Sequence, residues 1–100
     1  MEQLVFVYGS LLKKSQRNLI LGKNVTCDED ILSDYWKMPH PYFQIYPTIR
    51  PKSGEFVVGK TFKVNDDDLE KLDAYETSAY SKIEVVLKSG RKALAYTDLV

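Results

Sequence analysis

An uninterrupted apolar run near the start of the chain, Leu4-Val5-Phe6-Val7-Tyr8, limits the possible folds more than any other segment. A short apolar run without alternation predicts a strand that is buried on both faces, here over residues 3–8. The run stops at Gly9-Ser10-Leu11-Leu12, which predicts a small flexible turn. Because glycine tolerates positive φ and close approach, we expect Gly9 to adopt a positive φ and the turn to present free N–H groups to a ligand.

Downstream of this turn the sequence alternates between strand and helix patterns. Residues 15–22 predict a short helix with Ser15 as its N-cap and Gly22 after its C-terminus. Asn65 and the acidic residues after it predict the start of a second helix over 66–76. The pattern therefore predicts one strand-rich α+β domain over residues 1–100. Further strands are expected near 24–34, 42–46, 56–64, 80–88 and 92–99, the last two joined by a turn at Ser89-Gly90.

The second predicted helix carries a carboxylate where a third leucine would be expected. Residues three, four and seven apart share a helix face, so Glu76 should lie on the same stripe as Leu69 and Leu72. An inward carboxylate must be paired, protonated or facing a cleft, because burying it ionised and alone costs several kcal/mol. The alternative is that the helix frays after Ala74 and leaves Glu76 in solvent.

Charge and the few reactive side chains exclude several function classes. Lys plus Arg and Asp plus Glu both number 14, so no strong field favours nucleic acid or an anionic membrane. Cys27 precedes Asp28-Glu29-Asp30, whose negative charge would disfavour a thiolate, so Cys27 is a poor candidate for a nucleophile. His40 stands between two prolines, which predicts an exposed turn or loop. One Cys and one His cannot form an ordinary zinc site, and no metal site is expected.

The N-terminus carries no targeting pattern. Met1-Glu2-Gln3 lacks the basic residues of a signal peptide, and the apolar run is interrupted at Gly9, well short of a membrane span. We therefore expect a cytoplasmic protein with no membrane partner.

A set of short motifs, in order along nearly the whole chain, resembles the gamma-glutamyl cyclotransferase-like superfamily. The resemblance is nearest to its small single-domain, AIG2-like members related to gamma-glutamylamine cyclotransferase. The motifs are Tyr8-Gly9-Ser10-Leu11, Tyr46-Pro47-Thr48-Ile49, residues 58–64, Leu69-x-x-Leu72-Asp73-x-x-Glu76, Tyr80 and Ala95-Tyr96.

This resemblance implies a small closed or nearly closed mixed β-barrel, with short helices packed around it and a pocket between the Tyr8–Leu11 loop and Glu76. It also implies an acyltransferase that releases 5-oxoproline and a free amine from a small gamma-glutamyl compound, without a cofactor. Glu76 would act first as general base and then as general acid. The substrate-binding residues implied are Tyr8, Gly9, Ser10, Leu11, Tyr80 and Tyr96.

Several alternatives stay open. Tyr8, Tyr80 and Tyr96 could each be an ordinary core tyrosine. Many relatives have glycine after the acid and a longer segment before the next tyrosine, whereas here Thr77-Ser78-Ala79 joins Glu76 to Tyr80 directly. The chain could therefore be a non-catalytic module that binds a small carboxylate-bearing metabolite in the same pocket, or a structural partner protein. A serine nucleophile at Ser10 is disfavoured, because the turn does not match the Gly-x-Ser-x-Gly elbow.

Overall fold

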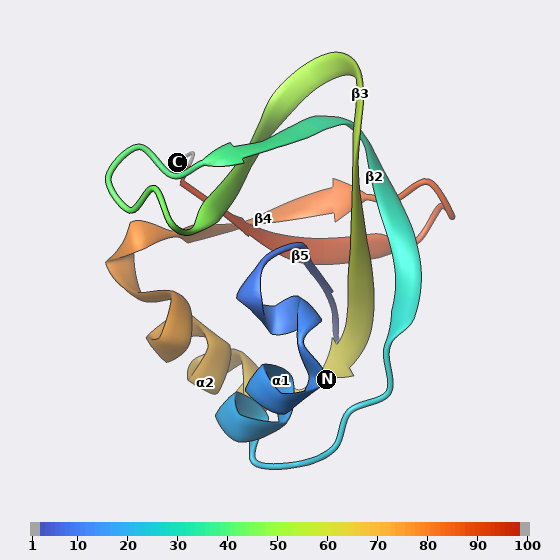
Figure 1. The fold of residues 1–100 in the computed structure, drawn as a ribbon. Helices are drawn as coiled ribbons and strands as arrows, with labels where there is room; N and C mark the ends of the chain where they lie inside the picture. The colour runs from blue at the N-terminus through green and yellow to red at the C-terminus, as the bar shows by residue number, and fades with distance from the viewer. Residues whose placement is uncertain (1–2, 99–100) are drawn as a thin grey trace.

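A five-stranded mixed sheet curls around a core on its inner face, and two α-helices pack against its outer face (Figure 1). The computed structural model describes residues 3–98. The strand order in the sheet is β2-β3-β1-β5-β4. The strands are β1 Gln3–Val7, β2 Asp28–Pro39, β3 Pro47–Val64, β4 Ser81–Val86 and β5 Lys92–Thr97. The helices are α1 Lys14–Leu21 and α2 Asp66–Glu76, with 3₁₀ turns η1 Ser10–Leu12 and η2 Thr77–Ala79.

Strand β1 is the centre of the sheet and is buried on both faces, as its sequence predicts. It runs antiparallel to β3 and parallel to β5. Alternate side chains enter two separate cores. Val5 and Val7 pack in a core with α1 and α2, whereas Phe6 and Tyr8 pack inside the curl of the sheet. The helices lie side by side across the outer face (Figure 1). The end of β1 therefore lies between the two cores, with neighbouring side chains in each.

The sheet is curled far enough that its two edges approach each other, which confirms the expected α+β, nearly closed half-barrel. The turn after β4 reaches β2, where the backbone N–H of Lys88 donates to the carbonyl of Ile31 at 2.7 Å. Ser89 Oγ donates to Asp30 Oδ2 at 2.6 Å beside it. These contacts fix the curvature, and Gly90 at φ 90° forms the predicted turn. No helix in residues 3–98 is long and apolar enough to cross a membrane.

The helix and strand predictions differ from the structure in four places. The strand predicted at 42–46 is wrong, because those residues form a loop and β3 begins only at Pro47. β3 then runs for 18 residues through Pro51, where its pairing with β2 shifts register at Ser33 and Tyr35. Predicted strand 24–34 begins later and runs longer, as β2. Helix α1 is capped at Lys13 rather than Ser15, because η1 immediately precedes it.

Helix α2 has the predicted bounds. The side chain of Asn65 accepts from the N–H of Asp68 at 2.8 Å, and the Asp68 carboxylate accepts from the N–H of Asn65 at 3.0 Å. This reciprocal cap satisfies two N–H groups that the first turn would otherwise leave without partners. The cap fixes where the helix begins. The start of the helix in turn decides which residues lie on its inner face, including those at its far end, eleven residues after Asn65.

Candidate functional site

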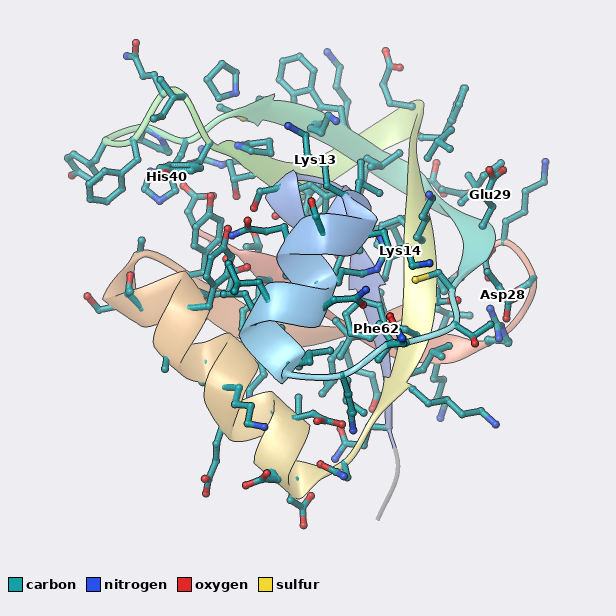
Figure 2. All side chains as sticks on the ribbon, turned by 60° about the horizontal axis from the view of Figure 1, so that its bottom comes forward. Lys13, Lys14, Asp28, Glu29, His40 and Phe62 are labelled. Atoms are coloured by element: carbon teal, nitrogen blue, oxygen red, sulfur yellow. The ribbon has the colours of Figure 1, made fainter. Side chains whose placement is uncertain are left out.

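A cavity of about 280 Å³ lies between the end of β1 and the end of α2. The cavity lies where the sequence predicts a pocket, with the Tyr8–Leu11 loop on one side and Glu76 on the other. Figure 2 shows His40 in the loop before β3, which contributes a third wall. The walls include Tyr8, Ser10, Phe43, Tyr46, Tyr75, Glu76, Tyr80 and Tyr96.

Glu76 is the last residue of α2 and lines this cavity, so the alternative in which the helix frays after Ala74 is wrong. Leu72 on the same stripe is fully buried, and Leu69 is 8% exposed. Within residues 3–98 no hydrogen bond or ion pair engages the Glu76 carboxylate. Its removal from water raises its pKa to about 7. Glu76 can therefore exist in both protonation states near neutral pH.

The Tyr8–Leu11 loop presents backbone donors, although not for the expected reason. Gly9 has φ −124°, so the expected positive φ is wrong. Glycine is needed instead because Pro47 packs against it, and a Cβ at Gly9 would lie 2.9 Å from Pro47 Cγ. Within residues 3–98 the N–H groups of Gly9, Ser10 and Leu11 donate to no other residue. They stand at the opening of η1, where a ligand oxygen can accept them.

The three tyrosines singled out from the sequence all line the cavity, and all use their hydroxyl groups within the protein. Tyr8 donates to the carbonyl of Tyr96, Tyr96 donates to Asp73 Oδ1 at 2.6 Å, and Tyr80 donates to the carbonyl of Pro47 at 2.7 Å. Burial raises the pKa of Tyr8 and Tyr96, and raises the pKa of Tyr80 to about 12. They are neutral wall residues, and Tyr8 and Tyr96 belong equally to the core.

Tyr75 is a cavity residue that the sequence reasoning missed. Its hydroxyl shares a hydrogen bond of 2.7 Å with Ser10 Oγ and accepts from Gln16 Nε2 at 3.2 Å. The side chain thus ties the end of α2 to the loop and to α1. The spacing Leu72-x-x-Tyr75 places it one turn after a buried leucine, and this signal could have identified it.

His40 was expected in an exposed turn, but its side chain is only 2% exposed. Nδ1 accepts from the N–H groups of Tyr42 and Phe43, at 3.1 and 3.2 Å. With Nδ1 accepting, the ring proton is on Nε2, which donates to the carbonyl of Ala79 at 3.0 Å. The flanking prolines do produce a loop, but backbone N–H groups of this loop donate to the imidazole instead of to water. His40 thereby joins the aromatic wall, Phe43 and Tyr46, to the segment that follows Glu76.

Comparison with known proteins agrees with this geometry. The model of the family described as gamma-glutamyl cyclotransferase, AIG2-like, matches residues 5–100. The chain belongs to this family.

Proteins of known sequence or structure that are similar to this chain include plant proteins. AIG2-like protein D of Arabidopsis thaliana is 33% identical over 82 residues, which are 81% of this chain and 53% of that protein. This member of the family thus spans about half the length of the curated relative it matches. An Arabidopsis thaliana protein solved in solution is 25% identical with a TM-score of 0.83, over 97% of this chain and 62% of its own.

The fold is shared with a cyclotransferase. A solved structure described as a gamma-glutamyl cyclotransferase superposes with a TM-score of 0.80 at 23% identity, and the match covers 97% of this chain and 66% of that one. This AIG2-like chain therefore has the fold of that structure.

Proposed function

We propose that the chain is a gamma-glutamyl cyclotransferase that releases 5-oxoproline and a free amine from a small gamma-glutamyl amine or amino acid. The observation that carries this proposal is Glu76, an unpaired and desolvated carboxylate that shares a cavity with the unengaged N–H groups of the Tyr8–Leu11 loop. No cofactor enters the proposed reaction.

The reaction needs one group that first removes a proton and then returns it. The substrate's α-amine attacks its own γ-carbonyl carbon, a C–N bond forms, and Glu76 takes the proton that the amine nitrogen loses. The bond from the same carbon to the leaving amine then breaks, and Glu76 gives that proton to the departing nitrogen. A pKa near 7 suits both steps at neutral pH, because neither protonation state is strongly favoured.

The loop and the aromatic walls supply binding and shape. The N–H groups of Gly9, Ser10 and Leu11 bind the substrate carboxylate or the oxyanion that develops on the γ-carbonyl oxygen. A cavity of about 280 Å³ is small, so a bound substrate is held curled, with its amine against its carbonyl. Tyr8, Tyr80 and Tyr96 form the walls that keep it in this conformation.

A non-catalytic module for the same ligands is the alternative, and the acid argues against it. A site that merely holds an anionic metabolite gains nothing from a second carboxylate in the same cavity, because the two negative charges repel. An enzyme gains the proton transfer described above.

The experiment that separates the two is turnover by the wild-type protein. A panel of gamma-glutamyl amines and gamma-glutamyl amino acids is incubated with the protein, and both 5-oxoproline and the free amine are measured. The proposal expects the two products in equal amounts from at least one compound. Binding of a panel member by calorimetry without release of either product would identify the chain as a binding module instead.

A further inference from the structure

Arg17 is a buried cation that has no anionic partner. It lies in α1 and is 4% exposed. Its Nη1 donates to the carbonyls of Leu11 and Leu12, at 3.0 and 2.6 Å, while its Nε is buried and has no hydrogen-bond partner. No carboxylate within residues 3–98 forms an ion pair with it. A buried charge without a counter-charge is costly to folding, so its presence calls for a reason.

Three buried carboxylates, unlike Arg17, each have a side chain of opposite charge beside them. Asp68, almost fully buried, is paired with Lys23 at 2.9 Å. Asp98 is paired with Arg50, and Asp30 lies 3.5 Å from Arg91. Each of these three carboxylates thus has its cation inside the folded chain. Arg17 is left with two carbonyl dipoles instead of a negative charge.

The Leu11 carbonyl ends the Tyr8–Leu11 loop that borders the cavity, and the Leu12 carbonyl follows it at the end of η1. Arg17 contacts this loop from the α1 side, while the loop's N–H groups have no partner in residues 3–98. Among the described residues that line the cavity none is Lys or Arg, and Glu76 is already there. Positive charge that stabilises an anion in this cavity must therefore come from a side chain outside the cavity lining. Lys37 also donates to the loop, at the Tyr8 carbonyl, but its side chain is exposed and screened by water.

We infer that Arg17 is a positioning residue that orients the Tyr8–Leu11 loop and supplies, through it, the counter-charge for the α-carboxylate of the bound ligand. The inference rests on the proposed function for the nature of the ligand, a gamma-glutamyl compound or its product. Arg17 does not touch the reacting atoms. Its guanidinium holds the Leu11–Leu12 and Leu12–Lys13 peptide units, whose N–H groups donate to the carbonyls of Gly9 and Ser10. Those two carbonyls share peptide units with the N–H groups of Ser10 and Leu11, which bind the carboxylate. The charge of Arg17 therefore strengthens the N–H bonds to the ligand through one intervening hydrogen bond in a site of low dielectric.

The test pairs a change in the protein with a change in the ligand. The two probes are 5-oxo-L-proline and its primary amide, which differ only in the carboxylate charge, and neither requires turnover. Their dissociation constants are measured by calorimetry for wild type, Arg17→Met and Arg17→Lys. Lys71→Met is the matched control, because Lys71 also donates to a backbone carbonyl, that of Leu21 at 3.3 Å, away from the cavity.

Wild type and the Lys71→Met variant should prefer the acid over the amide by at least ~10-fold, the size of one good charge-assisted contact. In Arg17→Met this preference should fall toward 1, mostly through weaker binding of the acid, and Arg17→Lys should recover part of it. A purely structural arginine would weaken acid and amide alike. An unchanged preference in folded Arg17→Met, or no preference in wild type, would overturn the inference.

A measurement on the wild-type protein covers the case in which Arg17→Met does not fold. The ¹⁵N resonance of the Arg17 Nε–H should shift as 5-oxo-L-proline saturates the site and should stay in place with the amide. No shift at saturation overturns the inference. Because both experiments measure binding, their failure is distinct from failure of the proposed function, which turnover of the panel decides.

Discussion

Thr77, the residue after the candidate acid, holds a backbone conformation that favours glycine. Its φ is 60° and its ψ −164°, and apart from Asp34 no other non-glycine residue in residues 3–98 has positive φ. A β-branched side chain makes this conformation costlier, by roughly 1–3 kcal/mol. The positive φ of Thr77 ends α2 directly after Glu76 and starts η2. The short connection from Glu76 to Tyr80 therefore depends on this strained conformation.

Thr77→Gly should therefore stabilise the protein by about 1 kcal/mol, because relief of the strained φ outweighs the greater backbone freedom of glycine in the unfolded chain. Urea denaturation measures this change. Ser78→Gly is the control, since its backbone has no positive φ, and should be neutral or destabilising. A Thr77→Gly variant less stable than wild type would show that the threonine side chain contributes more than the strain removes.

The close contact between Gly9 and Pro47 gives a second prediction at this scale. A Cβ at position 9 would lie 2.9 Å from Pro47 Cγ and 3.3 Å from Cδ, so Gly9→Ala should cost about 1–3 kcal/mol of stability and weaken ligand binding. Pro47→Ala removes both contacting atoms. The double variant should thus be more stable than the sum of the two single changes predicts. Additive losses in denaturation experiments would contradict close packing as the reason for glycine.

The elements with local signals are the ones that the sequence predicts well. The cap of α2 is made by Asn65 and Asp68, three residues apart, and the turn at Gly90 needs only its own residues. β3 is different, because Pro47 and Pro51 are typical of loops, and only their pairing with Pro39 and Tyr35 of β2 makes the segment a strand. His40 was misplaced for the same reason, since its partner Ala79 is 39 residues away.

Replacing His40 should destabilise the loop between β2 and β3. His40→Phe preserves much of the ring volume and removes the acceptor for two backbone N–H groups and the donor to Ala79. A loss of about 2–3 kcal/mol is expected, since each unsatisfied buried group costs on the order of 1 kcal/mol or more. Amide exchange at Tyr42 and Phe43 should become faster. Tyr42→Ser, at a side chain 86% exposed, is the control and should stay within ~0.5 kcal/mol of wild type.

The curled sheet as a whole brings together a site whose parts are far apart in the sequence. Glu76 and the Tyr8–Leu11 loop could be found from the sequence, because one breaks a helical stripe and the other ends an apolar strand. Arg17 and the aromatic wall could not, because their roles depend on how α1 and the loop before β3 pack around the end of β1. The curvature that places them is itself a non-local feature, fixed where β2 meets the turn after β4.

The stability of the whole molecule should depend on pH through Glu76. Its folded pKa of about 7 lies above the ordinary 4.5, so the folded state binds this proton more tightly than the unfolded state does. Its contribution is therefore most favourable below pH 4.5 and is lost as pH rises through 7. Burial disfavours ionisation of Asp30 and Asp68, but hydrogen bonds and nearby cations outweigh it and lower the pKa of both, so acid weakens the fold below their ordinary range.

Wild type should thus be most stable near pH 5 and lose about 1–3 kcal/mol by pH 8, as expected for a half-buried carboxylate with this shift. Glu76→Gln has no such group, and its stability should change much less over that interval. Urea denaturation of both proteins at the two pH values measures the difference. Parallel pH dependence of the two proteins would mean that Glu76 ionises as freely as it does in water.

Glu76→Gln also tests whether this carboxylate carries the chemistry, through its effect on 5-oxoproline release. The amide keeps the side chain's size but cannot exchange a proton, so kcat/KM should fall by at least ~100-fold, as for a lost general base. Wild-type kcat/KM should decline below a pH of about 7, and the variant should lose that dependence. Glu70→Gln, on the exposed face of the same helix, should match wild type. A folded Glu76→Gln protein with wild-type turnover would contradict the assignment.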